Sequence, residues 1–158
     1  PWDKVDIQLR VMLLAPMEIT HAFLPDLLKR KNGHVIFISS VAGFVATPFG
    51  TPYSTAKFGV RAFAMALHGE SKSRGVDVSV VYPFFTRTNI LESEAYGNPP
   101  VKAMPEFLLE EPDAIIKAVI GGIAGKKLHI FPGKFSGILW NVNKLFPMIA
   151  PQMKAPWR

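Results

Sequence analysis

The chain has 158 residues, a hydrophobic fraction of 49% and no cysteine, which permits one domain with a buried core and excludes a disulfide framework or thiolate chemistry. Its formal net charge is +6, but the cations are scattered and the four histidines lie far apart, so neither a nucleic-acid interface nor a metal site is expected. The first ten residues carry charges without an apolar segment, and no later run of about 18 uncharged apolar residues follows. We therefore expect no signal peptide, no membrane-spanning helix and a cytoplasmic location.

The first predicted element is a long helix over residues 4–31, where apolar residues recur at helical spacing. Pro16 should bend this helix, because proline cannot donate the backbone hydrogen bond. The basic last turn and Asn32-Gly33 indicate the end of the helix, with a residue suited to positive φ. Residues 34–39 are short, β-branched and apolar on both faces, which is typical of a strand inside a parallel sheet.

A second helix is predicted over residues 53–73 and is ended by Arg74-Gly75. A second apolar strand follows over residues 76–82. The stretch 83–110 contains several prolines and no sustained period, which is typical of a binding loop in a compact domain.

Three shorter elements complete the chain. A helix is predicted over residues 112–124, with Pro112 in its first turn, followed by a strand over 127–131 and an amphipathic helix over 135–146. Helices and strands therefore alternate with short connections, which predicts an α/β fold with a parallel sheet and helices on its faces. We treat residues 1–158 as a single domain.

Ser40, Tyr53 and Lys57 form the most informative constellation. Tyr53 and Lys57 are four residues apart at the start of a predicted helix and therefore share a helical face. Ser40 ends the preceding strand, and ligands of open parallel sheets bind beyond the carboxyl ends of the strands. The three side chains are thus expected in one crevice.

These residue types suit the reduction of a carbonyl group. A carbonyl oxygen that receives hydride develops negative charge and needs a proton donor and a second hydrogen bond. A nearby ammonium favours the phenolate form of a tyrosine, so Lys57 would assist Tyr53 while Ser40 holds the oxygen. The alternative interpretation is that Ser40 only caps a turn and Tyr53 only lies on a helix surface, because Y-x-x-x-K alone is a common pattern.

The wider string around these residues is more specific. Residues 38–43 read I-S-S-V-A-G, and Tyr53-Ser-Thr-Ala-Lys57-Phe-Gly-Val follows, with thirteen residues from Ser40 to Tyr53. This string strongly resembles the short-chain dehydrogenase/reductase family, with its S-S-x-A-G strand end and Y-x-A-S/T-K helix start. The resemblance implies a three-layer Rossmann-type fold with a doubly wound parallel sheet, of which the first βαβ half is missing here.

The resemblance also implies a function and roles for the residues. It implies an NAD(P)-dependent oxidoreductase that transfers hydride between a nicotinamide cofactor and a carbonyl or alcohol, with a slight preference for NADP on family grounds. Ser40 would polarise the substrate, Tyr53 would be the acid/base, and Lys57 would also hold the nicotinamide ribose, to which Tyr53 is adjacent. No glycine-rich turn for the cofactor pyrophosphate is present, so the alternative is a truncated, non-catalytic fragment or pseudoenzyme that serves as an oligomeric scaffold.

Two further segments match the family with departures. After the second strand the family has Pro-Gly and then a threonine, whereas this chain has Pro83-Phe84 and then Thr86 and Thr88, which we take as cofactor contacts. Phe84 replaces the glycine, so a positive φ is expected there. In the first helix, Gln8 stands where many relatives have an asparagine that supports the lysine, and we include it among the catalytic candidates.

The expected partners are a small carbonyl or alcohol substrate and further copies of the chain. The resemblance implies a homodimer or homotetramer through residues 4–30 and 53–73. The tail after residue 134 combines tryptophans, phenylalanines and lysines, so peripheral membrane contact and packing on the pocket or a neighbouring subunit are both alternatives. An apolar substrate pocket is indicated by aromatic and aliphatic residues of the long loop, namely Phe84, Phe85, Leu91, Tyr96 and Phe107.

Overall fold

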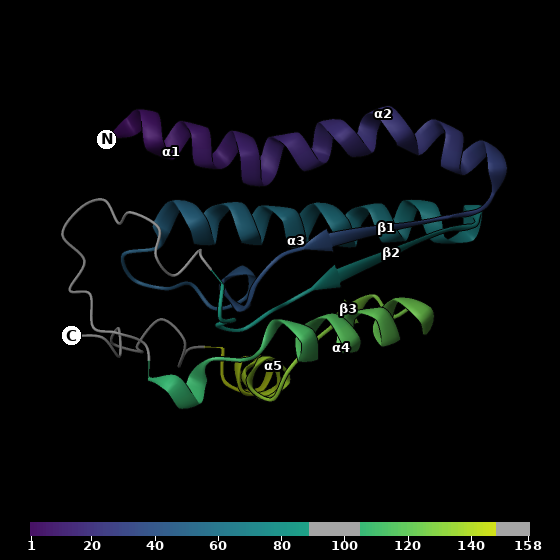
Figure 1. Ribbon diagram of the computed structural model, residues 1–158. Coiled ribbons are helices and arrows are strands. Elements are labelled where there is room, and N and C mark those ends of the chain that lie inside the picture. The colour runs from purple at the N-terminus through teal and green to yellow at the C-terminus, as the bar shows by residue number, and fades with distance from the viewer. Residues whose placement is uncertain (89–104, 148–158) are drawn as a thin grey trace.

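The computed structural model describes residues 1–88 and 105–147 (Figure 1). Three parallel strands, β1 (Gly33–Ile38), β2 (Val76–Val81) and β3 (His129–Ile130), form one open sheet in the order β1-β2-β3. Helices connect them, which confirms the predicted α/β fold and its partial Rossmann-type sheet.

The N-terminal helix is continuous but irregular in the middle. It runs through α1 (Trp2–Leu9), a π-helical turn η1 (Arg10–Leu14) and α2 (Ala15–Arg30). Pro16 lacks the N–H that would bond to the preceding turn, and the π-helical turn ends at Leu14, two residues before it. The predicted bend at Pro16 is therefore a local change of helix type.

The end of this helix differs from the expectation. Lys31 adopts the left-handed conformation, with φ 51°, and its N–H bonds to the carbonyl of Leu28. Gly33, predicted as part of the stop signal, is already the first residue of β1. Lys31 tolerates the left-handed conformation because its backbone hydrogen bonds to the last turn of the helix offset the steric cost.

The segment from Trp2 to Arg30 is 29 residues long, and by length and composition alone it is apolar enough to cross a membrane. The core helix of a soluble protein meets the same criterion but is mostly buried, whereas only 6% of the most apolar stretch of this segment is buried. Here the segment packs along α3 (Thr51–Ser71), as Figure 1 shows. The expectation of no spanning helix and a cytoplasmic location stays a prediction.

Helices lie on both faces of the sheet. His129 contacts Tyr82, on the face that carries α3, whereas the next residue, Ile130, lies against Gly122 of α4 (Pro112–Ala124). Successive strand residues point to opposite faces, so α3 and α4 lie on either side of the sheet. The α3 layer continues into α5 (Phe135–Leu145), which contributes Trp140 beside Tyr82.

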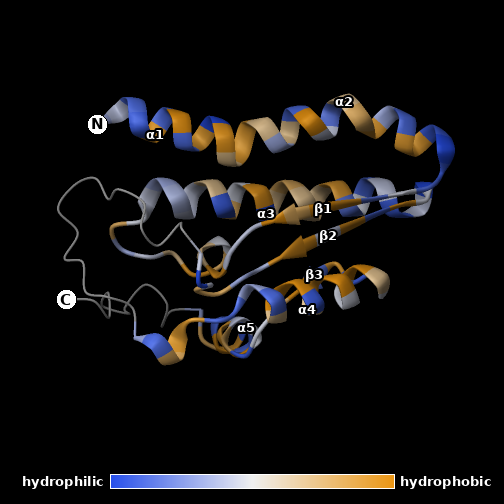
Figure 2. Cartoon of the chain, in the orientation of Figure 1, coloured by the Kyte–Doolittle hydropathy of each residue, from blue (hydrophilic) through white to orange (hydrophobic). Residues whose placement is uncertain are grey.

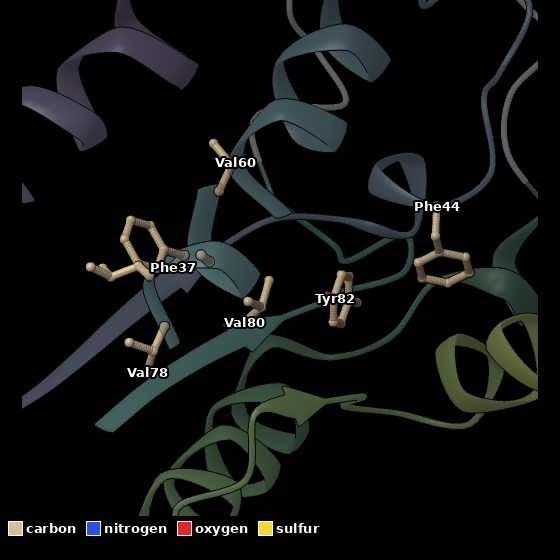
Figure 3. Close-up of a cluster of buried hydrophobic side chains, with 8 residues drawn as sticks. Phe37, Phe44, Val60, Val78, Val80 and Tyr82 are labelled. Carbon is tan, nitrogen blue, oxygen red and sulfur yellow. The ribbon is translucent and has the colours of Figure 1, made fainter. Parts of the chain in front are cut away.

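The core lies between α3 and the sheet (Figure 3). Because α3 presents a small residue, Ala64, close to the strands, larger side chains of β1 and β2 fill the space beneath it. The buried cluster consists of Phe37, Phe44, Val60, Ala64, Leu67, Val78, Val80 and Tyr82.

The opposite face of β1 is uncovered within the described residues. Ile36 and Ile38 are 36% and 54% exposed, and the carboxyl end of β1 is coloured hydrophobic in Figure 2. The outer edge of β1 also has no partner strand in the part of the chain that the structure describes. Within the described residues, β1 therefore exposes both an apolar face and an unpaired edge.

Strand β3 is shorter than the predicted 127–131. Its ladder with β2 extends from the bond between the Val80 N–H and the Leu128 carbonyl to the bond between the Tyr82 N–H and the Ile130 carbonyl. Pro132 follows shortly and cannot donate a ladder hydrogen bond, so the strand ends early. Short 3-10 turns complete the described elements: η2 (Val41–Gly43), η3 (Lys72–Arg74) and η5 (Glu106–Leu108).

Candidate active site

Ser40 lies directly beyond the carboxyl end of β1. The ladder with β2 continues one residue past the strand, where the Ser39 N–H donates to the Val81 carbonyl at 2.9 Å. Ser40 then caps η2, and its Oγ accepts a hydrogen bond from the Ala42 N–H at 3.2 Å. Because that bond uses only the oxygen as acceptor, the O–H of Ser40 keeps its proton for another partner.

Tyr53 and Lys57 lie together on the first turns of α3. Pro52 is in the first turn, where its missing N–H costs no helical bond, and the four-residue spacing places both side chains on one face. The Lys57 Nζ lies 5.6 Å from the centroid of the Tyr53 ring. It also donates to the Ile38 carbonyl at 3.0 Å, two residues before Ser40.

Lys57 therefore joins the start of α3 to the end of β1. Its side chain is half-buried, and desolvation lowers its pKa from the ordinary lysine value. Its terminal nitrogen is directed at a backbone carbonyl and an aromatic ring, and within the described residues it pairs with no carboxylate.

The segment Pro83–Thr88 adjoins Ser40. The Val41 N–H donates to the Pro83 carbonyl at 3.1 Å, which ties the loop after β1 to the loop after β2. Thr86 Oγ1 donates to the Phe84 carbonyl at 3.2 Å, and Thr88 Oγ1 donates to the Thr86 carbonyl at 3.4 Å. Both threonine hydroxyls thus shape the loop itself.

The expected positive φ at Phe84 is wrong. The non-glycine residues with positive φ in the described chain are Lys31, Phe49 and Lys126. The Phe84 ring packs edge-on against Phe85, with centroids 4.9 Å apart, and against Phe135 at 5.4 Å. Aromatic packing, rather than a glycine-like turn, therefore sets this part of the loop.

Arg87 connects the two ends of the long loop. Its N–H donates to the Glu110 carbonyl at 3.0 Å, and its guanidinium pairs with Glu106 and Glu111 at 3.2 and 3.0 Å. Residues 89–104 lie outside the described residues, and with them Leu91 and Tyr96. The two ends of the loop are nevertheless joined beside the candidate site.

Gln8 is half-buried on α1, which packs against α3. Within the described residues its side chain makes no hydrogen bond to Lys57, so its predicted support of the lysine stays a prediction. No group of three histidine, aspartate or glutamate side chains suited to a metal ion is found in residues 1–88 and 105–147.

Residue-by-residue reasoning missed the role of Ser39. This serine is 2% exposed, and its Oγ donates to the backbone carbonyl of Lys57 at 2.9 Å. Gly43 packs against the same carbonyl. The signal in the sequence was the motif I-S-S-V-A-G, in which Ser39 precedes Ser40 and Gly43 follows it by three residues.

Residues 2–98 match the family model described as short chain dehydrogenase. Over 157 residues the chain is 32% identical to a dehydrogenase/reductase SDR family protein 7-like from Drosophila melanogaster, covering 85% of this chain and 48% of that protein. It is 29% identical over 143 residues to a very-long-chain 3-oxoacyl-CoA reductase from Anas platyrhynchos, covering 89% of this chain and 43% of the other.

Solved structures show the same fold. A short chain dehydrogenase from Burkholderia cenocepacia in complex with NADP superposes with a TM-score of 0.78 at 17% identity, covering 94% of this chain and 58% of that chain. The chain spans about half the length of the curated relatives that it matches. On the family match and the shared parallel-sheet fold together, the chain belongs to the short chain dehydrogenase family.

Proposed function

We propose that this chain carries the catalytic part of an NAD(P)-dependent oxidoreductase that interconverts a carbonyl and an alcohol through Ser40, Tyr53 and Lys57. The observation that supports it most directly is the position of the Lys57 ammonium, 3.0 Å from the Ile38 carbonyl and 5.6 Å from the Tyr53 ring. This cation links the tyrosine to the strand end that carries Ser40.

Each of the three residues has a distinct role in the proton transfer. The Tyr53 hydroxyl donates a proton to the substrate oxygen during reduction and accepts it during oxidation. The Ser40 O–H donates a hydrogen bond to the same oxygen, since its own oxygen is already occupied by the Ala42 N–H. The Lys57 ammonium stabilises the negative charge that the tyrosine oxygen acquires on releasing its proton.

The residues present fit the nicotinamide end of such a cofactor. When bound, a nicotinamide cofactor supplies or accepts the hydride. Lys57 offers N–H donors toward ribose hydroxyls, and the backbone of Pro83 to Thr88 offers polar groups beside Ser40. We take NADP(H) as the preferred form, which agrees with the NADP bound to the structural neighbour from Burkholderia cenocepacia.

We propose an apolar substrate. Phe84, Phe85 and Phe135 form a connected aromatic group next to the loop that adjoins Ser40. Such a wall favours the hydrocarbon part of a ketone or alcohol over a charged one. The family relative from Anas platyrhynchos, a very-long-chain 3-oxoacyl-CoA reductase, acts on a substrate with a long hydrocarbon chain.

Self-association through the helices is also part of the proposal. Ile7, Val11 and Phe23 of the N-terminal helix are 58%, 63% and 64% exposed, in a segment that lies along α3. Apolar side chains gathered on an outer helix suit a contact with a second copy. Light scattering of the purified chain should show a dimer or tetramer, and Val11→Lys should shift it toward monomer. A monomeric wild type would contradict this part.

Cofactor titration tests the catalytic proposal. NADPH and NADH are added separately to the purified chain, and the fluorescence of the reduced nicotinamide is followed. Reduction of a probe ketone, acetophenone, is then measured with the nucleotide that binds. We expect saturable NADPH binding and cofactor-dependent turnover. An oligomer that binds neither nucleotide would overturn the proposal and favour the scaffold, for which the bare face and edge of β1 provide a docking surface.

A further inference from the structure

Two consecutive residues at the end of β1 hold Lys57 at both of its ends. The Ile38 carbonyl accepts from the Lys57 ammonium at 3.0 Å, and the Ser39 hydroxyl donates to the Lys57 backbone carbonyl at 2.9 Å. The end of β1 thereby contacts both the backbone and the terminal nitrogen of Lys57. We call these two bonds the Ser39–Lys57 clamp.

The serine bond is well placed to be rigid. Ser39 is 2% exposed, and its own N–H is fixed by the Val81 carbonyl at 2.9 Å as the last bond of the β1–β2 ladder. Helical geometry already pairs the Lys57 carbonyl with the N–H four residues later, so the serine hydroxyl takes the second lone pair of that oxygen. A hydrogen bond shielded from water in this way has no solvent competitor.

Gly43 makes the approach of strand and helix possible. A Cβ on Gly43 would lie 2.9 Å from the Lys57 carbonyl oxygen and would collide with the Ser39 hydroxyl. The turn η2 therefore packs directly against the hydrogen bond between Ser39 and the Lys57 carbonyl. The packing that gives Ser40 its position also holds the clamp.

We propose that Ser39 is a positioning residue for Lys57: by bonding the lysine carbonyl, it holds the ammonium beside Tyr53 and at the strand end that bears Ser40. It touches neither substrate nor cofactor. The inference rests on the proposed function for its catalytic consequence, but the clamp itself is a structural claim that is tested without turnover.

The test uses Ser39→Ala and Ser39→Cys, with Ser71→Ala as the matched control. Cysteine keeps the volume of the side chain but is a weak donor, so it separates the hydrogen bond from the packing. Ser71 is 1% exposed and donates to the Val76 carbonyl at 3.2 Å at the far end of the same helix. The control thus removes an equivalent buried bond that does not involve Lys57.

The first readout is the titration of Lys57 by NMR of its 13Cε. Burial lowers the pKa of Lys57, so a loosened and better hydrated lysine should titrate at higher pH in both Ser39 variants and not in Ser71→Ala. If Ser39→Ala does not fold, Ser39→Cys decides alone. A Lys57 titration that is unchanged from wild type in the folded Ser39 variants would overturn the clamp.

The second readout is turnover of acetophenone with NADPH. Both Ser39 variants should lose about tenfold in kcat with a KM for acetophenone within twofold of wild type, since a misplaced group affects the transition state most. Equal losses in Ser71→Ala would show a merely structural role and refute the assignment. A wild-type chain without turnover would reject the proposed function, while the Lys57 titration would still judge the clamp.

Discussion

Replacing Gly43 with alanine tests how closely η2 must approach α3. The added Cβ would lie 2.9 Å from the Lys57 carbonyl oxygen and 3.2 Å from its carbonyl carbon, and it would collide with the Ser39 hydroxyl. Two of these three atoms belong to a helix backbone and cannot rotate away. Overpacking of this kind lowers the free energy of unfolding by roughly 1–3 kcal/mol. Alanine also lowers the conformational entropy of the unfolded chain relative to glycine, which offsets about 0.4–1 kcal/mol of that loss.

The net expected loss for Gly43→Ala is therefore about 1–2 kcal/mol, which lowers the melting temperature by roughly 2–8 °C for a chain of this size. Calorimetry or a thermal circular dichroism scan measures it. Gly69 is the control, because it lies in α3, the helix that Gly43 approaches, and has nothing within 4 Å of an added Cβ. Gly69→Ala should stabilise the chain by about 0.5–1 kcal/mol. A Gly43→Ala variant as stable as Gly69→Ala would refute the close approach.

Three further outcomes follow from the packing around β3. Gly122→Ala should destabilise by roughly 1–3 kcal/mol in urea unfolding, because its Cβ would meet the Ile130 side chain at 2.7 Å, whereas Gly121→Ala should be neutral or stabilising. Tyr82→Phe should cost about 1 kcal/mol, since the buried hydroxyl, whose pKa burial raises to about 12, loses its 3.0 Å bond with His129; an unchanged urea midpoint would contradict this. Burial, with Arg61 adding to it, lowers the pKa of His129, so the unfolded chain binds a proton at higher pH and stability should fall as pH drops below about 6.5. His129→Gln should flatten part of that fall, and an identical pH profile would be the contrary result.

Sequence patterns predicted the order of the elements because each carries its own local signal. The strands β1 and β2 are short segments rich in β-branched apolar residues, and Pro112 opens α4 where the sequence predicted a helix. Strand β3 was overestimated because apolar residues continue toward Pro132, while strand length depends on pairing with β2, which ends sooner. Pairing is a tertiary property that periodicity does not contain.

In the candidate site, too, some features follow from local sequence patterns and others depend on the tertiary fold. The shared face of Tyr53 and Lys57 follows from their spacing on one helix, and the structure places them so. The bond between Ser39 and the Lys57 carbonyl depends on how near the strand end lies to α3, which no local pattern encodes. The contact between Phe84 and Phe135 likewise joins residues that are far apart in the chain, so local patterns do not predict it.

The central claim is that Tyr53 transfers the proton while Lys57 and Ser40 assist it. Tyr53→Phe removes the hydroxyl and leaves the ring beside Lys57, so the most direct measurement compares this variant with wild type in NADPH affinity and in NADPH-dependent reduction of acetophenone. We expect turnover to fall by about 10²–10⁴-fold with cofactor affinity within a few-fold of wild type. Turnover that survives the loss of this hydroxyl would contradict the account.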